Sequence, residues 1–219
     1  MARIIVLGGH GKVALLAESM LVEAGHPVRA VIRNPDHASE VAATGAEPVV
    51  ADLERLDQPG IDQLVHGFDV VVWSAGAGGG SPERTRAVDH DAALRVVDAV
   101  TRSGARLVMV SYFGSRRDHG VPPDDPFFAY AEAKSLVDEA IRDSGADWVI
   151  LAPSTLTLDD ETGIELDVPE GSVRSGTIPR ATVARLIAET VAHPAVRGLT
   201  IRCNGGETPV RQALGSLPS

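Results

Sequence analysis

The chain has 219 residues, of which 44% are hydrophobic and 23% are charged, and its formal net charge is −10. This composition is typical of a soluble globular protein and excludes disorder, collagen and fibre. Thirty acidic residues against 20 basic ones argue against nucleic acid and anionic membrane as partners. Cys203 is the single cysteine and the apolar runs fall far short of a membrane span, so we expect a cytoplasmic protein without signal peptide or membrane anchor.

Short apolar runs alternate with longer stretches of helical period, which predicts a parallel sheet with crossover helices. A strand over residues 3–7 leads into a helix over residues 12–24. The same apolar pattern predicts further strands, in chain order, over residues 28–32, 47–51, 68–74, 106–111 and 148–151. Longer helices are expected over residues 81–103, with a serine cap and a proline in the first turn, and over residues 127–143.

The remaining chain, residues 153–219, is predicted to extend the same domain. We expect a hairpin formed by residues 164–168 and 172–177, then a helix over residues 179–192 and a strand over residues 199–203. The whole chain, residues 1–219, is therefore predicted to form one α/β domain with a Rossmann-like, doubly wound parallel sheet and helices on both faces. Residues 153–219 form its small extension on the substrate side.

The first predicted strand runs into a glycine-rich segment with glycine at positions 8 and 11 and alanine at position 14. Small residues at this G-x-x-G-x-x-A spacing let the backbone turn sharply and approach a pyrophosphate at a helix N-terminus. Because the segment follows a strand and opens a helix, we expect a dinucleotide here rather than an ordinary tight turn. The candidate cofactor-binding residues of this loop are Gly8, His10, Gly11, Lys12 and Val13. Lys12 could equally be a solvated residue of the first helical turn.

The residue that follows the second predicted strand distinguishes between two cofactors. NAD enzymes usually place a carboxylate there to bind the ribose 2′-hydroxyl, and NADP enzymes place a cation. This chain has Arg33 at that point, and the next acid is Asp36. A guanidinium matches a phosphate in charge and geometry, so the predicted cofactor is NADP (NADPH), with NAD less favoured. The alternative is a solvated arginine.

Tyr130 and Lys134 form the most specific pattern, because the chain contains only two tyrosines and two lysines. Positions i and i+4 of a helix share a face, so the phenol and the ammonium could meet one substrate. A neighbouring cation is expected to lower the phenol pKa from about 10 and so favour acid–base catalysis. The alternative is a half-buried surface tyrosine beside a solvated lysine.

Further segments carry a resemblance to a known family. They are Asp52 and Leu53 after the third strand, the run from Ser74 to Gly76 after the fourth, Val110 and Ser111 after the fifth, the run from Leu151 to Pro153 after the sixth, and residues 178–181. With the glycine loop, Arg33 and the Tyr–Lys pair, they make the chain similar over nearly its whole length to the atypical, NAD(P)H-binding short-chain dehydrogenase/reductases, a group that includes NmrA-like and biliverdin reductase B-like proteins.

This resemblance implies roles for individual residues. By resemblance, Asp52 and Leu53 lie beside adenine, and Ala75 and Gly76 pack on the adenosine side. Pro153 and Thr155 are expected to line the nicotinamide. Ser111 is expected to join Tyr130 and Lys134 in a catalytic set, in which Lys134 also binds the nicotinamide ribose. The chain departs from the family pattern at Ala152, where an arginine is usual, and at Thr182, where an acid is common.

The predicted function is that of an NADP-dependent oxidoreductase acting on a small carbonyl, alcohol or quinone-like substrate. The alternatives are an NADP(H)-binding sensor without turnover and, less favoured because the tail is short, a sugar epimerase. The loop over residues 113–126 is either a substrate lid or a solvated charged segment. The histidines lack metal-ligand spacing, so no metal is expected, and the sequence leaves open whether the chain is a monomer or a homodimer.

Overall fold

The computed structural model describes residues 1–78 and 81–217. Its strands are β1 (Ile4–Leu7), β2 (Val28–Ile32), β3 (Glu47–Val50), β4 (Val70–Trp73), β5 (Arg106–Val110), β6 (Trp148–Pro153), β7 (Thr155–Thr157), β8 (Gly163–Leu166), β9 (Thr177–Pro179) and β10 (Leu199–Gly206). Its helical segments are α1 (Lys12–Glu23), η1 (Pro35–His37), α2 (Ala38–Ala43), α3 (Gln58–Val65), α4 (Pro82–Thr85), η2 (Arg86–Ala92), α5 (Ala93–Ser103), α6 (Phe128–Asp143), α7 (Arg180–Ala192) and α8 (Val210–Gly215).

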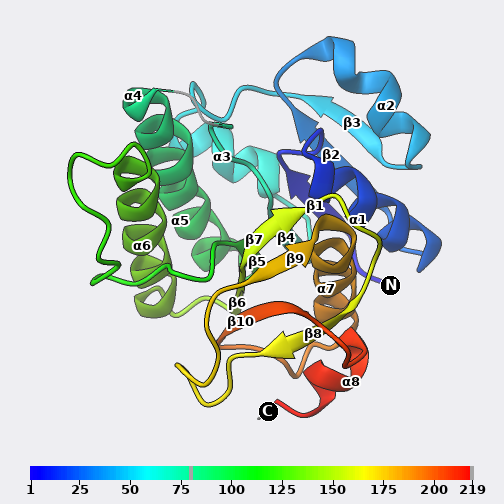
Figure 1. Ribbon diagram of the computed structural model, residues 1–219. Helices are drawn as coiled ribbons and strands as arrows, with labels where there is room; N and C mark the ends of the chain where they lie inside the picture. Colours follow the sequence, from blue (N-terminus) through cyan, green and yellow to red (C-terminus); the bar gives the residue numbers. More distant parts are fainter. Residues whose placement is uncertain (79–80, 218–219) are drawn as a thin grey trace.

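The main sheet has the strand order β3-β2-β1-β4-β5-β6-β10-β8. Neighbouring strands are parallel except for β8, which runs antiparallel to β10 at one edge. Helices α3, α5 and α6 cover one face of the sheet, and α1 and α7 cover the other (Figure 1). The predicted Rossmann-like, doubly wound fold is therefore confirmed. In the described part of the chain, no helix is long and apolar enough to cross a membrane.

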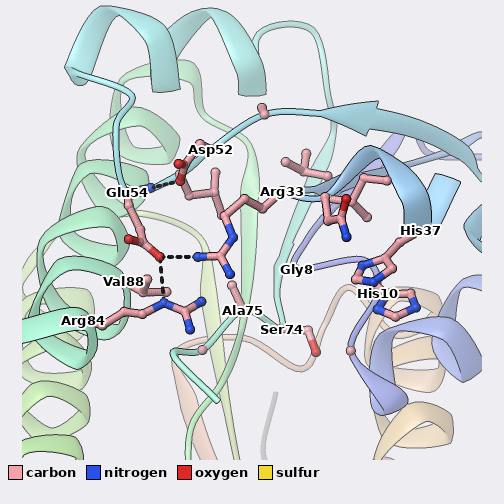
Figure 2. A pocket seen from close by; sticks show the side chains of 17 residues that line it. Gly8, His10, Arg33, His37, Asp52, Glu54, Ser74, Ala75, Arg84 and Val88 are labelled. Carbon is pink, nitrogen blue, oxygen red and sulfur yellow. Dashed lines mark hydrogen bonds and ion pairs between the residues drawn. The ribbon is translucent and has the colours of Figure 1, made fainter. Parts of the chain in front are cut away.

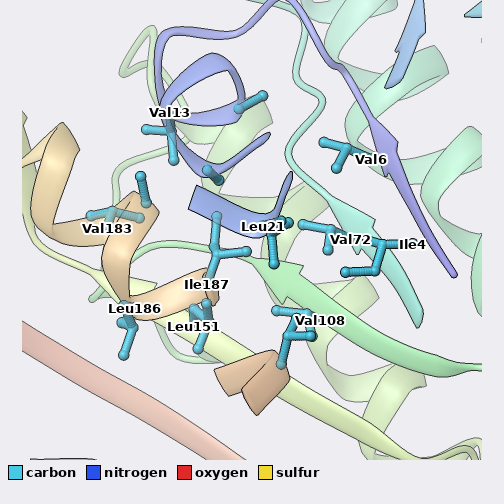
Figure 3. Packing of buried hydrophobic residues seen from close by; sticks show 14 of the residues in the cluster. Ile4, Val6, Val13, Leu21, Val72, Val108, Leu151, Val183, Leu186 and Ile187 are labelled. Carbon is cyan, nitrogen blue, oxygen red and sulfur yellow. The ribbon is translucent and has the colours of Figure 1, made fainter. Parts of the chain in front are cut away.

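The central strand β1 is buried on both faces, which explains why its sequence is a continuous apolar run rather than an alternating one. Ile4 and Val6 point into the core beneath α1 and α7 (Figure 3), while Ile5 and Leu7 point into the core on the opposite face. This two-sided packing fixes the end of β1, and hence the start of the glycine loop, within the molecule.

Residues 82–103 form one helical run that begins as predicted. The Ser81 hydroxyl accepts a hydrogen bond from the backbone N–H of Arg84 at 3.4 Å, and Pro82 occupies the first turn. The middle of the run, η2, is π-helical. Such widened turns are rare and are frequent at functional sites. The run therefore deviates from regular helix where it passes the carboxyl end of the sheet, and η2 carries the buried Asp89.

The predicted hairpin of residues 164–168 and 172–177 is wrong. Strand β8 pairs with β10 instead, and β9 pairs in parallel with β7 in a separate two-stranded sheet. The apolar pattern located these strands approximately, but it carries no information about which distant strand each one pairs with. Strand β7 and the helices α3 and α8 were not predicted at all.

Candidate active site

A cavity of about 300 Å³ lies at the carboxyl ends of β1, β2, β3 and β4 (Figure 2). In doubly wound folds, ligands bind in the crevice where the strand order reverses, which here is beside β1. The cavity is lined by eight of the predicted cofactor-binding residues: Gly8, His10, Gly11, Arg33, Asp52, Leu53, Ala75 and Gly76. The fold thus brings these eight residues to one cleft, and their contacts with a cofactor stay a prediction.

The glycine loop at the start of this cleft has a shape that only glycine permits. Gly8 has φ +90°, and a Cβ atom on it would lie 2.5 Å from the Cα atom of Ala75. Gly11 is the N-cap residue of α1, which has neither a side-chain cap nor an acidic residue in its first turn. The first N–H groups of a helix have no partner within the helix, so an anion can bind them. Both features fit the pyrophosphate of a dinucleotide.

Two histidines lie at the rim beside this loop. The rings of His10 and His37 are stacked, with centroids 3.5 Å apart and planes 14° apart, and His10 Nε2 lies 2.9 Å from an oxygen of Glu40. The other two loop candidates do not line the cavity. Lys12 is exposed and Val13 packs in the core beneath α1.

At the opposite rim, two arginines meet one carboxylate. Arg33, which follows β2, and Arg84, on α4, donate to the same Oε1 atom of Glu54 at 2.9 and 3.0 Å (Figure 2). Sequence reasoning missed Arg84 and Glu54, because the two lie 30 positions apart and no local pattern links them. It also did not name as site residues the seven others that line the cavity, namely Val31, Ile32, Asn34, His37, Ala51, Ser74 and Val88.

A second cluster of polar residues lies at the carboxyl end of β5. The hydroxyl of Ser111 donates to Asp138 Oδ2 at 2.6 Å, and the hydroxyl of Ser115 donates to the same oxygen. Asp138 is fully buried on α6, and burial raises the pKa of its carboxyl group, against the opposing effects of Lys134 and the two serines. The Ser111 proton is therefore directed at Asp138, and the hydroxyl presents its lone pairs to other partners.

Lys134 is 1% exposed and lies one turn before Asp138 on α6. Its Nζ atom donates to the backbone oxygen of Val110 at 2.8 Å and lies 3.6 Å from the sulfur of Met109. Burial lowers the pKa of this ammonium, while the charges of Asp138 and Asp89 oppose that effect. The interpretation of Lys134 as a solvated helix residue is wrong.

Tyr130 is half-buried in a cluster of aromatic rings. Its ring centroid lies 5.7 Å from that of Tyr112 and 5.2 Å from that of Phe127. Burial raises the pKa of Tyr130 above its ordinary value of 10, and the charges of Asp89 and Asp138 raise it further. The predicted lowering of this pKa by Lys134 is therefore wrong, because the burial of the phenol, followed by the charges of the two acids, raises the pKa instead.

The buried acids Asp89 and Asp138 are the functional candidates that sequence reasoning missed at this end of the sheet. Asp89 Oδ2 accepts from the backbone N–H of Ala77 at 3.0 Å, and Asp89 Oδ1 lies 3.2 Å from the position of a Cβ atom on Gly76. One oxygen of each acid is buried with no hydrogen-bond partner among the residues that the structure describes. For Asp138 a signal existed, because the spacing i+4 from Lys134 continues the helix face that Tyr130 begins.

The segment after β5 runs beside the end of β6, which brings the last predicted residues to the same end of the sheet. The backbone N–H of Ser111 donates to Leu151 at 2.7 Å, and that of Phe113 donates to Pro153 at 2.8 Å. Pro153 is buried, whereas Thr155 is exposed. The structure thus brings Ser111, Lys134 and Pro153 to the ends of β5 and β6.

The loop over residues 113–126 is tied to α6 along its length. Arg117 pairs with Glu139 at 3.0 Å, and His119 lies 3.2 Å from Glu132. Together with the hydrogen bond from Ser115 to Asp138, these two contacts hold the loop against α6. Among residues 1–78 and 81–217, no group of three or more His, Cys, Asp or Glu side chains is arranged to hold a metal ion.

Comparison with known proteins decides the family. The model of a family described as NAD(P)H-binding matches residues 8–194. The chain belongs to this NAD(P)H-binding family. The match confirms the resemblance to the atypical short-chain dehydrogenase/reductases and makes a nicotinamide dinucleotide the class of cofactor, without distinguishing NADP from NAD.

Several known proteins match the chain along almost its full length. UPF0659 protein C216.03 of Schizosaccharomyces pombe is 34% identical, over 97% of this chain and 94% of its own length. The uncharacterized sugar epimerase YhfK of Bacillus subtilis is 26% identical, over 98% of this chain and 100% of its own length. A solved structure from Bacillus halodurans, described as an NAD-dependent epimerase/dehydratase, is 29% identical with a TM-score of 0.89 and covers 99% of this chain and 100% of its own.

Proposed function

We propose that this NAD(P)H-binding protein is an NADP(H)-dependent oxidoreductase that transfers a hydride between its cofactor and a small carbonyl/alcohol or quinone-like substrate. The observation that supports it is Tyr130, a half-buried phenol whose ring lies beside that of Tyr112, shortly after β5, in a family whose members bind nicotinamide dinucleotides. When bound, the cofactor supplies or accepts a hydride. Tyr130 gives its proton to the substrate oxygen in the reduction and takes it back in the oxidation. The phenol is protonated at neutral pH, which is the form that the reducing direction requires.

The neighbouring residues would position the reactants. An ammonium has three N–H donors, and the bond from Lys134 to Val110 uses one of them, so another can hold the hydroxyls of the nicotinamide ribose. Ser111 donates to Asp138, so its oxygen is suited to accept a hydrogen bond from an alcohol. Pro153 and Thr155 would line the nicotinamide, and Asp52, Leu53, Ala75 and Gly76 would border the adenosine.

The test compares wild type with Tyr130→Phe on a panel of carbonyl, quinone and flavin substrates with NADPH. We expect kcat to fall at least about 100-fold while the Kd of NADPH changes little, because the phenol acts on the substrate oxygen. Tyr112→Phe is the matched control, since its hydroxyl is buried with no partner in the described part of the chain. Unchanged NADPH consumption by Tyr130→Phe would remove this phenol from the mechanism.

The name of the B. subtilis relative favours a second function, that of a sugar epimerase. An epimerase returns its nicotinamide to the starting state in each cycle, so it consumes no NADPH, whereas a reductase consumes one NADPH for each product molecule. The extension after β6 consists of short strands and two helices, which leaves little structure for a nucleotide sugar. Tight NADPH binding without consumption or epimerisation would instead identify a sensor.

A further inference from the structure

The arginine pair at the rim of the cleft has an arrangement that the proposed function does not use. Arg33 and Arg84 share one oxygen of Glu54, and all three residues line the cavity (Figure 2). Local hydrogen bonds hold the backbones of Arg84 and Glu54. The backbone N–H of Arg84 donates to the hydroxyl of Ser81, which caps α4, and the backbone N–H of Glu54 donates to Asp52 Oδ1 at 3.1 Å. The three side chains meet because three separate elements hold them there.

The charges of this group do not balance. Two guanidinium groups face one carboxylate, which leaves one positive charge and several N–H donors without an acceptor in the group. The other acid that lines the cavity, Asp52, lies 3.4 Å from Arg55. A phosphate dianion supplies acceptors for both arginines, whereas a ribose hydroxyl supplies one acceptor at most and can donate to a carboxylate.

We infer that Arg84 forms, with Arg33, a two-arginine site for the ribose 2′-phosphate, and that Glu54 sets the preference between NADP(H) and NAD(H). Glu54 neutralises part of the arginine charge, so it lowers the affinity for the phosphate. The same carboxylate can accept the 2′-hydroxyl of NAD(H). The inference rests on the cofactor preference in the proposed function and adds to it two specificity-determining residues, Arg84 and Glu54.

The test uses the purified full chain and two probes that differ only in the 2′-phosphate, namely adenosine 2′,5′-diphosphate and AMP. We expect Arg84→Gln to raise the Kd of the diphosphate at least about tenfold and to change the Kd of AMP less than about twofold. Arg86→Gln removes the same charge from the same helical run but does not line the cavity, so it should leave both values unchanged. Arg84→Lys should retain part of the affinity.

Glu54→Gln should change the affinity for NADPH in the opposite direction to Arg84→Gln. Its amide oxygen can still accept from an arginine, but the negative charge is gone, so we expect the Kd of NADPH to fall about tenfold and the Kd of NADH to rise. Equal losses for both probes in Arg84→Gln, or weaker NADPH binding by Glu54→Gln, would overturn the inference. All these Kd values are measured by calorimetry, which needs no turnover. The results are therefore independent of the Tyr130 test. Equal wild-type affinities for the two probes would instead refute the proposed cofactor preference.

Discussion

Glu18 is a buried acid beneath the glycine loop, and its replacement by glutamine tests how the loop is supported. Its side chain on α1 is fully buried, and the hydroxyl of Thr44 donates to one carboxylate oxygen at 3.3 Å. The other oxygen lies 3.0 Å from the position of a Cβ atom on Gly9 and has no hydrogen-bond partner in the described chain. Burial raises the pKa of this group from 4.5 to about 8.

The raised pKa of Glu18 makes stability depend on pH with a known sign. Below pH 4.5 the carboxyl group is protonated in both the folded and the unfolded state, so it causes no difference. Between 4.5 and about 8 only the unfolded state ionises, and the free energy of unfolding falls by about 1.4 kcal/mol for each pH unit. At pH 7 the accumulated loss is about 3 kcal/mol, and above about 8 it stays constant.

The glutamine of Glu18→Gln has nearly the same shape and cannot ionise. The free energy of unfolding of this variant should therefore exceed that of wild type by about 3 kcal/mol at pH 7 and equal it near pH 4. Urea unfolding from pH 4 to 8.5 at fixed ionic strength measures the difference. Glu23→Gln, at an exposed position of the same helix, is the control for net charge. A difference between Glu18→Gln and wild type that does not change with pH would refute the reasoning.

Two further substitutions test the loop and the core. Gly8→Ala places a Cβ atom against the backbone of Ala75, so it should abolish NADPH binding in calorimetry and lower the free energy of unfolding by about 1–3 kcal/mol. Gly25→Ala is the control, because a Cβ atom there would meet no atom within 4 Å, and this variant should keep NADPH binding. Unchanged affinity in Gly8→Ala would contradict the role given to the loop. Leu21→Ala should lower the free energy of urea unfolding by about 2–5 kcal/mol with the Kd of NADPH unchanged, because Leu21 is fully buried in the core cluster beneath α1 and α7; a loss below about 1 kcal/mol would contradict that packing.

The sequence predicted the parts of the fold that depend on local periodicity. Strands buried on both faces and helices with one apolar face leave a direct pattern, and the Ser81 cap marked the start of a helix correctly. The pairing of β8 with β10 leaves no such pattern, because it is decided by two segments that are distant in sequence. The π-helical register of η2 also left no local signal.

The candidate site was predictable to a similar extent. Gly8 and Arg33 could be located because each follows a strand at the carboxyl edge of the sheet, and both line the cavity. The spacing of Tyr130 and Lys134 placed both on one helix. It could not show that Lys134 is buried against Val110, since that contact depends on how closely α6 packs on β5. Catalytic roles for these residues stay predictions.

The widened turn in η2 has a consequence for evolution by insertion and deletion. One helical run presents Arg84 to the rim of the cleft and, past the start of η2, Asp89 beneath Gly76. Each residue of an α-helix advances the chain by about 100° around its axis. A π-helical turn holds one residue more than an α-helical turn, so the loss of a single codon within η2 would be absorbed by a return to regular winding, with Arg84 and Asp89 keeping their present contacts. The same deletion in a regular stretch of the run would rotate one contact by about 100° relative to the other and separate them.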